Sequence, residues 1–172
     1  PAVANFWEEG VHMNHWHQNR ISKLIIKKLF GTLSNKKITI LGFAFKANTN
    51  DTRESAAIQI CKDLIEEGAE LFIHDPIVSP KQIKFDLEIT ENTDEVNIFS
   101  GNWNDGKSFE NIFKGSHAIV ILTEWKEYTK IEWSKISKIM KKPAWIFDAR
   151  SILERQEILD TDINFWRIGD GL

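Results

Sequence analysis

Lys46 and Arg53 are two cationic side chains that follow the first strand-like run of the sequence. That apolar run, residues 38–41, ends at Gly42, a mostly polar segment follows, and a periodic apolar stretch begins at Ala56. This order predicts a strand, an anion-contacting loop and a helix, the first unit of a nucleotide-binding α/β domain. The loop carries cations where a glycine-rich fingerprint would carry further glycines. We therefore expect side chains, and not backbone alone, to meet phosphate or sugar oxygens.

Three further polar clusters each follow an apolar run, so they lie where predicted strands end. They are His74-Asp75-Pro76, Thr123-Glu124-Trp125 and Asp148-Ala149-Arg150. Ligands of parallel sheets bind beyond the carboxyl ends of the strands. These clusters and the loop at 45–53 are therefore the candidate site.

Each cluster also has a purely structural interpretation. Asp75 can bind a ribose, or it can form the turn before the following proline. Glu124 and the threonine before it resemble the start of a helix, so a structural role is favoured. Arg150 can bind substrate, or it can pair with Asp148 or Asp51 to hold strand ends together.

The hydrophobic pattern predicts an α/β fold, with a Rossmann-like parallel sheet, helices on both faces and a long N-terminal helix before it. Strands are expected at 38–42, 71–73, 118–122, 145–147 and 164–168, and helices at 55–67, 109–113, 128–140 and 154–159. Residues 83–89 alternate in a way that allows a short strand, and residues 92–105 are expected to form a loop. The pattern of residues 1–35 is helical, with Gly10 as a break that leaves a helix from about residue 11 to 30.

Composition places the chain among ordinary globular proteins. Its 172 residues, 42% hydrophobic and 27% charged, suit one domain plus an appendage, or one large domain. The net charge of -3 argues against general binding to nucleic acid or to membrane surfaces. No apolar run approaches the roughly 20 residues of a membrane span. The single cysteine, Cys61, excludes an internal disulfide, so a reducing, cytoplasmic compartment is expected.

The N-terminal helix suggests an interface rather than a metal site. His12 and His15 share a helix face that His17 does not, and no Cys or carboxylate at suitable spacing completes a set of ligands. An apolar stripe on the same helix needs a partner unless it folds back on its own core, so we expect a homodimer through residues 1–33. The stripe consists of Trp7, Val11, Leu24, Ile25 and Phe30.

Taken together, the strand-end clusters resemble a known family. The matching residues are Gly42-Phe43-Ala44-Phe45-Lys46, Asp51-Thr52-Arg53-Glu54-Ser55, Asp75-Pro76, Thr123-Glu124-Trp125 and Phe147-Asp148-Ala149-Arg150. In this order they are similar to the C-terminal, UDP-binding domain of the UDP-glucose/GDP-mannose dehydrogenases, and among these to that of the UDP-glucose 6-dehydrogenases. Residues 1–35 resemble the end of the family's central dimerisation region, and residues 36–172 resemble its UDP-sugar-binding domain.

The resemblance implies an activity that this chain does not carry alone. Such enzymes oxidise the C6 alcohol of UDP-glucose to the carboxylate of UDP-glucuronate in two steps and reduce two NAD. Their catalytic cysteine, general base and dinucleotide fingerprint lie in the preceding domains. Here no Gly-x-Gly-x-x-Gly occurs and Cys61 falls on a predicted helix, so no catalytic residue is expected and the chain should be inactive by itself.

The resemblance also assigns roles to individual residues. Phe45, Lys46 and Arg150 are implied to bind the nucleotide sugar, and Arg53 is implied to reach NAD, which is held mainly by the N-terminal domain. The implied partners are the UDP-sugar substrate and that N-terminal domain of the same enzyme.

Three positions depart from the family pattern and leave the sugar open. Asn48 stands where family members often have an acid, Asn50 where a glycine is frequent, and Ser151 where some members have a second arginine. The alternatives are a dehydrogenase of another nucleotide sugar, such as a UDP-N-acetyl sugar or GDP-mannose, and a stand-alone nucleotide-binding or dimerisation module. The chain begins at Pro1 without a methionine, which suits a fragment of a longer protein.

Overall fold

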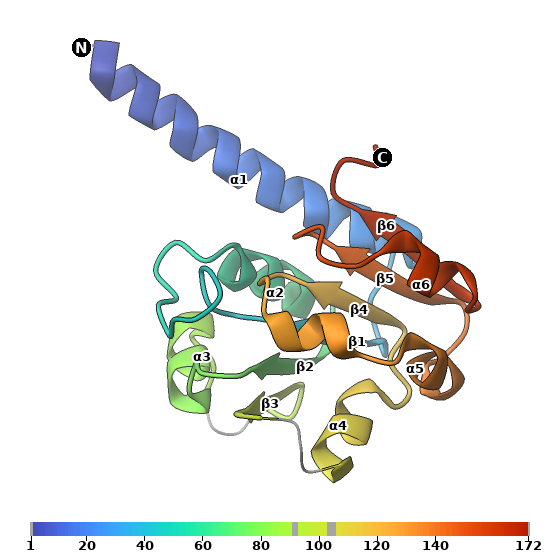
Figure 1. Cartoon of the computed structure of the whole chain (residues 1–172). Coiled ribbons are helices and arrows are strands. Elements are labelled where there is room, and N and C mark those ends of the chain that lie inside the picture. The colour runs from blue at the N-terminus through green and yellow to red at the C-terminus, as the bar shows by residue number, and fades with distance from the viewer. Residues whose placement is uncertain (1, 91–92, 103–105, 172) are drawn as a thin grey trace.

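A parallel sheet of six strands runs through the centre of the computed structural model, which describes residues 2–90, 93–102 and 106–171 (Figure 1). The strand order is β3-β2-β1-β4-β5-β6, and every neighbouring pair is parallel. The strands are β1 (Lys37–Leu41), β2 (Glu70–Asp75), β3 (Val96–Ser100), β4 (Ala118–Ile121), β5 (Ala144–Asp148) and β6 (Ile163–Arg167). The order reverses between β1 and β4, which is the point at which doubly wound sheets bind their ligands.

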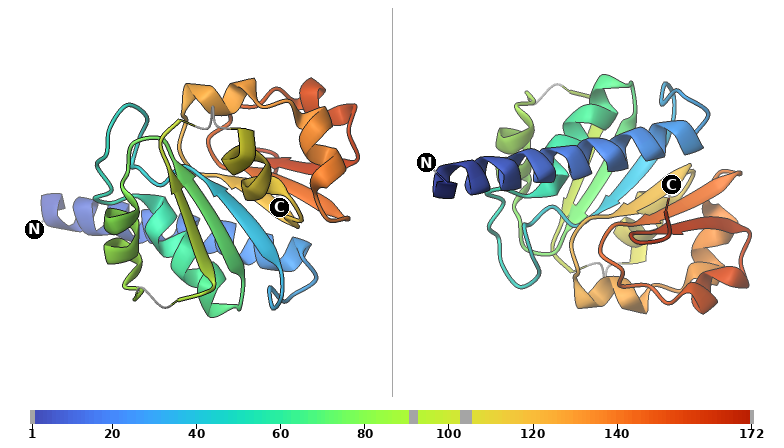
Figure 2. Two further views of the ribbon diagram at one scale, coloured as in Figure 1. Left: turned by 90° about the horizontal axis from the view of Figure 1, so that it is seen from below. Right: turned by 90° about the horizontal axis from the view of Figure 1, so that it is seen from above.

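Helices cover both faces of the sheet, as the sequence predicts. They are α1 (Ala2–Lys28), α2 (Ala56–Glu66), α3 (Pro80–Leu87), α4 (Gly106–Phe113), α5 (Trp133–Ile139) and α6 (Arg155–Leu159), with a 3-10 helix η1 (Lys126–Lys130). Both views of Figure 2 place α1 and α2 on one face and α5 and α6 on the other. All four residues of β4 are therefore buried, because each face of this central strand meets a helical layer.

Helix α1 is longer than expected, and the side chains near its C-terminal end belong to the core. It runs from Ala2 through Gly10, so the predicted break at that glycine is wrong. Its N-terminal end extends beyond the rest of the chain (Figure 1). Near its C-terminal end, Leu24 and Ile25 are buried, and the Ser22 hydroxyl donates to Asp63 Oδ2 of α2 at 2.7 Å.

The expected apolar stripe of α1 is only partly available to a partner. Its members Leu24 and Ile25 pack into the chain's own core, whereas Phe30 is 75% exposed. The side chains of Trp7 and Val11 lie outside the described residues. No helix in the described part of the chain is both long enough and apolar enough to cross a membrane.

Residues 80–100 differ from the sequence-based expectation in two places. The alternating segment 83–89 contains a helix, α3, because Ser79 caps it through a bond from Gln82 N–H at 3.2 Å and Pro80 opens its first turn. Ile83 and Leu87, four residues apart, are its buried side chains. The segment expected to be loop contains β3, an edge strand that forms by pairing with β2.

The helix expected at 128–140 consists of two shorter ones. The 3-10 helix η1 ends at Lys130, and α5 begins at Trp133. Ile131 lies between them in an extended conformation, with φ −68° and ψ 129°. The other expected helices and strands are confirmed, with their ends shifted by up to a few residues.

Gly42 ends β1 in a conformation and a space that only glycine tolerates. Its φ is +92°, and its N–H donates to His74 O at 2.8 Å. A Cβ built on it would lie 2.4 Å from Thr123 Cβ and 2.7 Å from the Thr123 backbone nitrogen. The loop after β1 and the loop after β4 can therefore come this close only because position 42 has no side chain.

Gly42→Ala is expected to lower the free energy of unfolding by about 2–5 kcal/mol, from left-handed backbone strain together with overpacking against Thr123. Gly115→Ala is the matched control, because Gly115 has φ +75° but a Cβ added there would meet no other part of the chain within 4 Å. The control should show the backbone strain alone, about 1–2 kcal/mol. Urea denaturation followed by circular dichroism measures both, and equal losses would contradict the steric argument.

Candidate functional site

The four strand-end clusters lie together at the carboxyl edge of the sheet, as predicted. They lie in the last residues of β1, β2, β4 and β5 or in the loops that follow, and these four strands are consecutive neighbours in the sheet order. Parallel strands present their carboxyl ends on one edge, so clusters far apart in the sequence become adjacent.

The loop after β1 holds Phe45 and Lys46 at the surface. Phe45 N–H donates to Asp51 O at 2.8 Å, which closes the loop at its base. Ser55 then caps α2, because its hydroxyl oxygen accepts from Ala57 N–H at 3.3 Å while the hydroxyl donates to Phe43 O at 2.7 Å. Phe45 is 48% exposed and Lys46 is exposed, so both residues are open to a ligand.

Arg53 forms a two-pronged ion pair with Asp51 on the same loop. Its Nε donates to Asp51 Oδ1 at 3.0 Å and its Nη2 donates to Oδ2 at 2.8 Å. These bonds lower the pKa of Asp51 to about 2. The Arg53 side chain is 87% exposed, and its Nη1 group is not part of this pair. The structure therefore keeps Arg53 at the outer side of the loop, with hydrogen-bonding capacity left for an anion.

Arg150 pairs with Glu124, and among the described residues its guanidinium forms no hydrogen bond or ion pair with either expected structural partner, Asp148 or Asp51. Arg150 Nε donates to Glu124 Oε2 at 2.7 Å, and Nη2 donates to the same oxygen. Glu124 Oε1 accepts the Ala47 N–H at 3.1 Å. Although desolvation by burial raises the pKa of Glu124, these hydrogen bonds hold it below its usual value. Glu124 thus joins the loop that carries Lys46 to the loop that carries Arg150.

Asp148 uses its carboxylate on its own turn. Oδ1 accepts the Arg150 N–H at 3.0 Å, and Oδ2 accepts the Ile152 and Leu153 N–H groups, each at 2.9 Å. The acid is fully buried. It therefore shapes the backbone that presents Arg150 to solvent, and it does so without pairing with the Arg150 side chain.

Asp75 has the structural role rather than that of a ribose ligand. It is fully buried, and its carboxylate accepts five N–H groups of the described residues. Oδ2 accepts from Phe43 at 2.8 Å, Ala44 at 3.0 Å and the Trp125 indole at 3.2 Å, and Oδ1 accepts from Ile77 and Val78 at 2.9 Å each. Both oxygens are occupied by the protein, so neither is presented to a ligand.

Two buried residues near Asp75, Tyr128 and His74, form hydrogen bonds that the sequence did not predict. Tyr128, the chain's single tyrosine, is buried, and its hydroxyl donates to His74 O at 3.1 Å. His74 Nε2 lies 3.0 Å from Gly101 O. Burial lowers the pKa of His74 and, with the nearby Asp75 and Glu127 charges, raises that of Tyr128. Thr123 does not cap a helix as expected, because its hydroxyl donates to Ala44 O at 2.7 Å.

Cys61 lies away from these clusters on the buried face of α2. Desolvation by burial raises the pKa of its thiol far above the usual value, so it is not a reactive nucleophile. Within the described residues no group of three His, Cys, Asp or Glu side chains could hold a metal ion, and the His15 side chain lies outside those residues.

A protein-family model matches a stretch of the chain that includes all four strand-end clusters. The family model described as UDP-glucose/GDP-mannose dehydrogenase family, UDP binding domain, matches residues 39–155, which include Phe45, Lys46, Arg53 and Arg150. The chain belongs to this dehydrogenase family.

Curated relatives extend the family match to nearly the full chain. A UDP-glucose 6-dehydrogenase from Drosophila melanogaster is 43% identical over 98% of this chain and 36% of its own length. A UDP-glucose 6-dehydrogenase from Caenorhabditis elegans is 40% identical over 98% of this chain and 34% of its own length. The chain therefore spans about a third of the curated relatives it matches.

A solved structure supports the dehydrogenase family's fold. The crystal structure of an NDP-N-acetyl-D-galactosaminuronic acid dehydrogenase from Methanosarcina mazei superposes with a TM-score of 0.66 at 21% identity. The match covers 89% of this chain and 28% of that protein. At this identity it shows a shared architecture, and it carries no information about the sugar.

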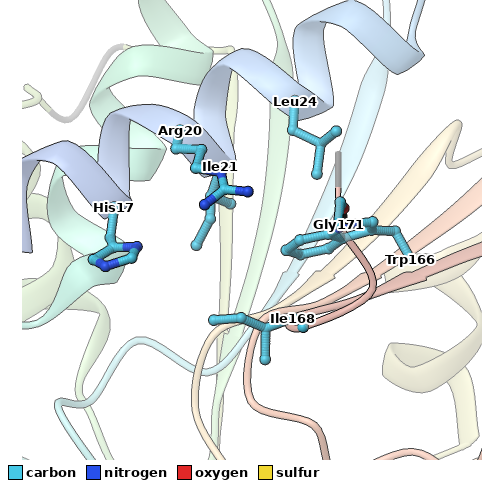
Figure 3. A pocket seen from close by; sticks show the side chains of 8 residues that line it. His17, Arg20, Ile21, Leu24, Trp166, Ile168 and Gly171 are labelled. Carbon is cyan, nitrogen blue, oxygen red and sulfur yellow. Dashed lines mark hydrogen bonds between the residues drawn. The ribbon is translucent and has the colours of Figure 1, made fainter.

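A cavity separate from the strand-end clusters lies between α1 and the C-terminal tail of this family member (Figure 3). Its volume is about 320 Å³. The side chains around it are mainly apolar, with Arg20 and His17 from α1 as the basic groups. The other side chains that line it are Ile21, Leu24, Trp166 and Ile168. None of the residues that the family resemblance implies for nucleotide-sugar binding lines it.

Asp75→Asn is expected to destabilise the fold by about 2–6 kcal/mol. Whichever way the amide is turned, its NH2 group faces at least two N–H donors that lose their acceptor, and each buried unpaired donor costs about 1–3 kcal/mol. Thermal or urea denaturation gives the loss. Asp160→Asn, at an exposed position, is the matched control and should change stability by less than about 0.5 kcal/mol. A loss below about 1 kcal/mol in Asp75→Asn would contradict the role of this carboxylate.

The Asp51 carboxyl is expected to titrate near pH 2 in the folded chain, because Arg53 stabilises its ionised form. The contribution of this pair is fully present above the ordinary pKa of 3.8, and it is lost as the pH falls from there through about 2. Carbon-13 NMR of the side-chain carboxyl measures the midpoint. Arg53→Ala should move it up toward the ordinary 3.8, and Arg155→Ala, which removes a pair with Asp170, should leave it in place. An unchanged midpoint in Arg53→Ala would exclude the pair as the cause.

Proposed function

We propose that this chain is the nucleotide-sugar-binding part of an NAD-dependent UDP-glucose 6-dehydrogenase, which converts UDP-glucose to UDP-glucuronate by a two-step oxidation at C6. The observation that carries the proposal is the placement of Phe45, Lys46 and Arg150 on loops joined by Glu124, beside the point where the strand order reverses. The 43% and 40% identities to UDP-glucose 6-dehydrogenases support this choice within the family.

The three residues have distinct tasks in the proposed complex. The exposed Phe45 ring offers an apolar surface against the nucleotide sugar. Lys46 and Arg150 meet diphosphate or sugar oxygens through charge-assisted hydrogen bonds, which are stronger than neutral ones. Arg150 gives Nε and one Nη2 hydrogen to Glu124, so its Nη1 edge is the part that faces substrate oxygens.

Arg53 is assigned to the cofactor. NAD, held mainly by the N-terminal domain, accepts the hydride when it is bound. The exposed guanidinium of Arg53 fits a contact with the anionic part of such a ligand, because Asp51 occupies only its Nε and Nη2. The catalytic cysteine and general base are assigned to the part of the relatives that this chain does not match, so the chain alone should not oxidise the substrate.

The assembly that we propose is a homodimer built through the helical region at 1–35, with the N-terminal domain of the same enzyme as the second partner. Met13 and Trp16 are 59% and 57% exposed on α1, beyond the part of the helix that is packed in the core. A cytoplasmic location is proposed on the single unpaired cysteine, which suits a reducing compartment.

Lys46→Ala and Arg150→Ala are each expected to weaken UDP binding by roughly 10- to 150-fold, since each removes a charge-assisted hydrogen bond. Isothermal titration calorimetry of the 172-residue chain with UDP measures this, with GDP as the competing nucleotide. Lys138→Ala, an exposed cation on α5, is the charge-matched control and should bind UDP as the unsubstituted chain does.

Arg53→Ala should behave differently from these two variants. In the full-length enzyme it should raise KM for NAD more than KM for UDP-glucose. If Arg150→Ala lowered thermal stability and left UDP affinity unchanged, its pairing with Glu124 would be purely structural and the proposed substrate role would be wrong.

A further inference from the structure

Glu124 occupies the position between the two halves of the candidate site. It follows β4, which lies between β1 and β5 in the sheet. One oxygen of its carboxylate accepts the backbone N–H of Ala47, next to Lys46, and the other accepts the Arg150 guanidinium. A single side chain therefore fixes the distance between the loops that carry the two proposed substrate cations.

We propose that Glu124 is a positioning residue for nucleoside diphosphate sugars, which holds Arg150 in one orientation relative to the Lys46 loop before the ligand arrives. This inference rests on the proposed function of the chain. The bonds from Nε and Nη2 to Glu124 leave the Nη1 hydrogens and the second Nη2 hydrogen for the ligand. Glu124 itself touches no substrate atom in this arrangement.

The physical gain is preorganisation. An exposed arginine has many rotamers, and binding an anion in one of them costs conformational entropy. The Arg150 and Glu124 side chains are 36% and 35% exposed, so solvent screens the pair and its effect on overall stability is small. The same modest free energy still biases the direction of the guanidinium, because the bonds from both Nε and Nη2 to Glu124 require one geometry.

The direction in which UDP affinity changes in Glu124→Gln distinguishes a positioning role from a purely electrostatic one. Glu124→Gln removes a negative charge beside a site for an anion, so Coulomb interactions alone predict tighter UDP binding. Loss of preorganisation predicts the opposite, a weakening of about 2- to 12-fold. Glu124→Asp keeps the charge but is one methylene shorter, so it cannot reach Ala47 and Arg150 together and should also weaken binding.

The test is a double-mutant cycle by calorimetric titration of the 172-residue chain with UDP. The variants are Glu124→Gln, Arg150→Ala and the two combined, with thermal melting measured in parallel. Glu132→Gln is the control, since Glu132 pairs with Lys135 at 2.7 Å on an exposed surface. We expect Glu124→Gln to weaken UDP binding, the same change to have less than about a 2-fold effect when Arg150 is already alanine, and Glu132→Gln to have none.

Several outcomes would overturn the inference. Unchanged or tighter binding in Glu124→Gln would do so, whether or not the melting temperature falls. An equal loss in the Arg150→Ala background would show that Glu124 does not act through Arg150. If Arg150→Ala weakens binding while both Glu124 variants do not, only this inference fails. If the unsubstituted chain does not bind UDP, or Arg150→Ala has no effect, the proposed function fails and the positioning role fails with it.

Discussion

The buried carboxylate of Asp75 at the end of β2 accepts N–H groups from three separate segments of the chain. An anion removed from water is tolerated only when hydrogen bonds replace its hydration, and here the loop after β1, the turn after β2 and Trp125 supply them. The same bonds fix these segments relative to one another. The loop that carries Phe45 and Lys46 therefore owes its position to an acid that is not available to the ligand.

At the carboxyl edge of the sheet, two acids are buried and three cations are exposed. Asp75 and Asp148 are fully buried and serve as acceptors for backbone N–H groups at strand ends. Lys46, Arg53 and Arg150 are at the surface. Arg53 forms an ion pair with Asp51, and Arg150 forms one with Glu124. Exposed pairs of this kind add little to stability, so their main consequence is the direction in which each guanidinium points. A chain with a net charge of -3 can thus still present three exposed cations at the carboxyl edge of its sheet.

Most of the fold follows from local pattern, and the exceptions have identifiable causes. The buried strands β1, β4 and β5 were predictable because each is an apolar run of strand length, which ends at a glycine in β1 and at polar residues after β4 and β5. The alternation at 83–89 was misleading, since the cap at Ser79 and the proline after it start a helix whose buried positions are four residues apart. β3 was missed because the segment that contains it is rich in polar residues. It forms a strand at the edge of the sheet by pairing with β2.

Local sequence was enough to place the strand ends, and hence to tell which side chains lie at the carboxyl edge of the sheet. It also carried the resemblance to the dehydrogenase family that the family model confirms. It was not enough to tell which charged groups meet. Arg150 and Glu124 are 26 residues apart in the chain, and Asp75 and Phe43 are 32 apart. Such partners depend on the order of strands in the sheet, because parallel neighbours bring distant loops to one edge. Only the folded structure therefore shows what Asp75 and Glu124 do. Asp75 holds the loop after β1 in place, and Glu124 connects that loop to the one that carries Arg150.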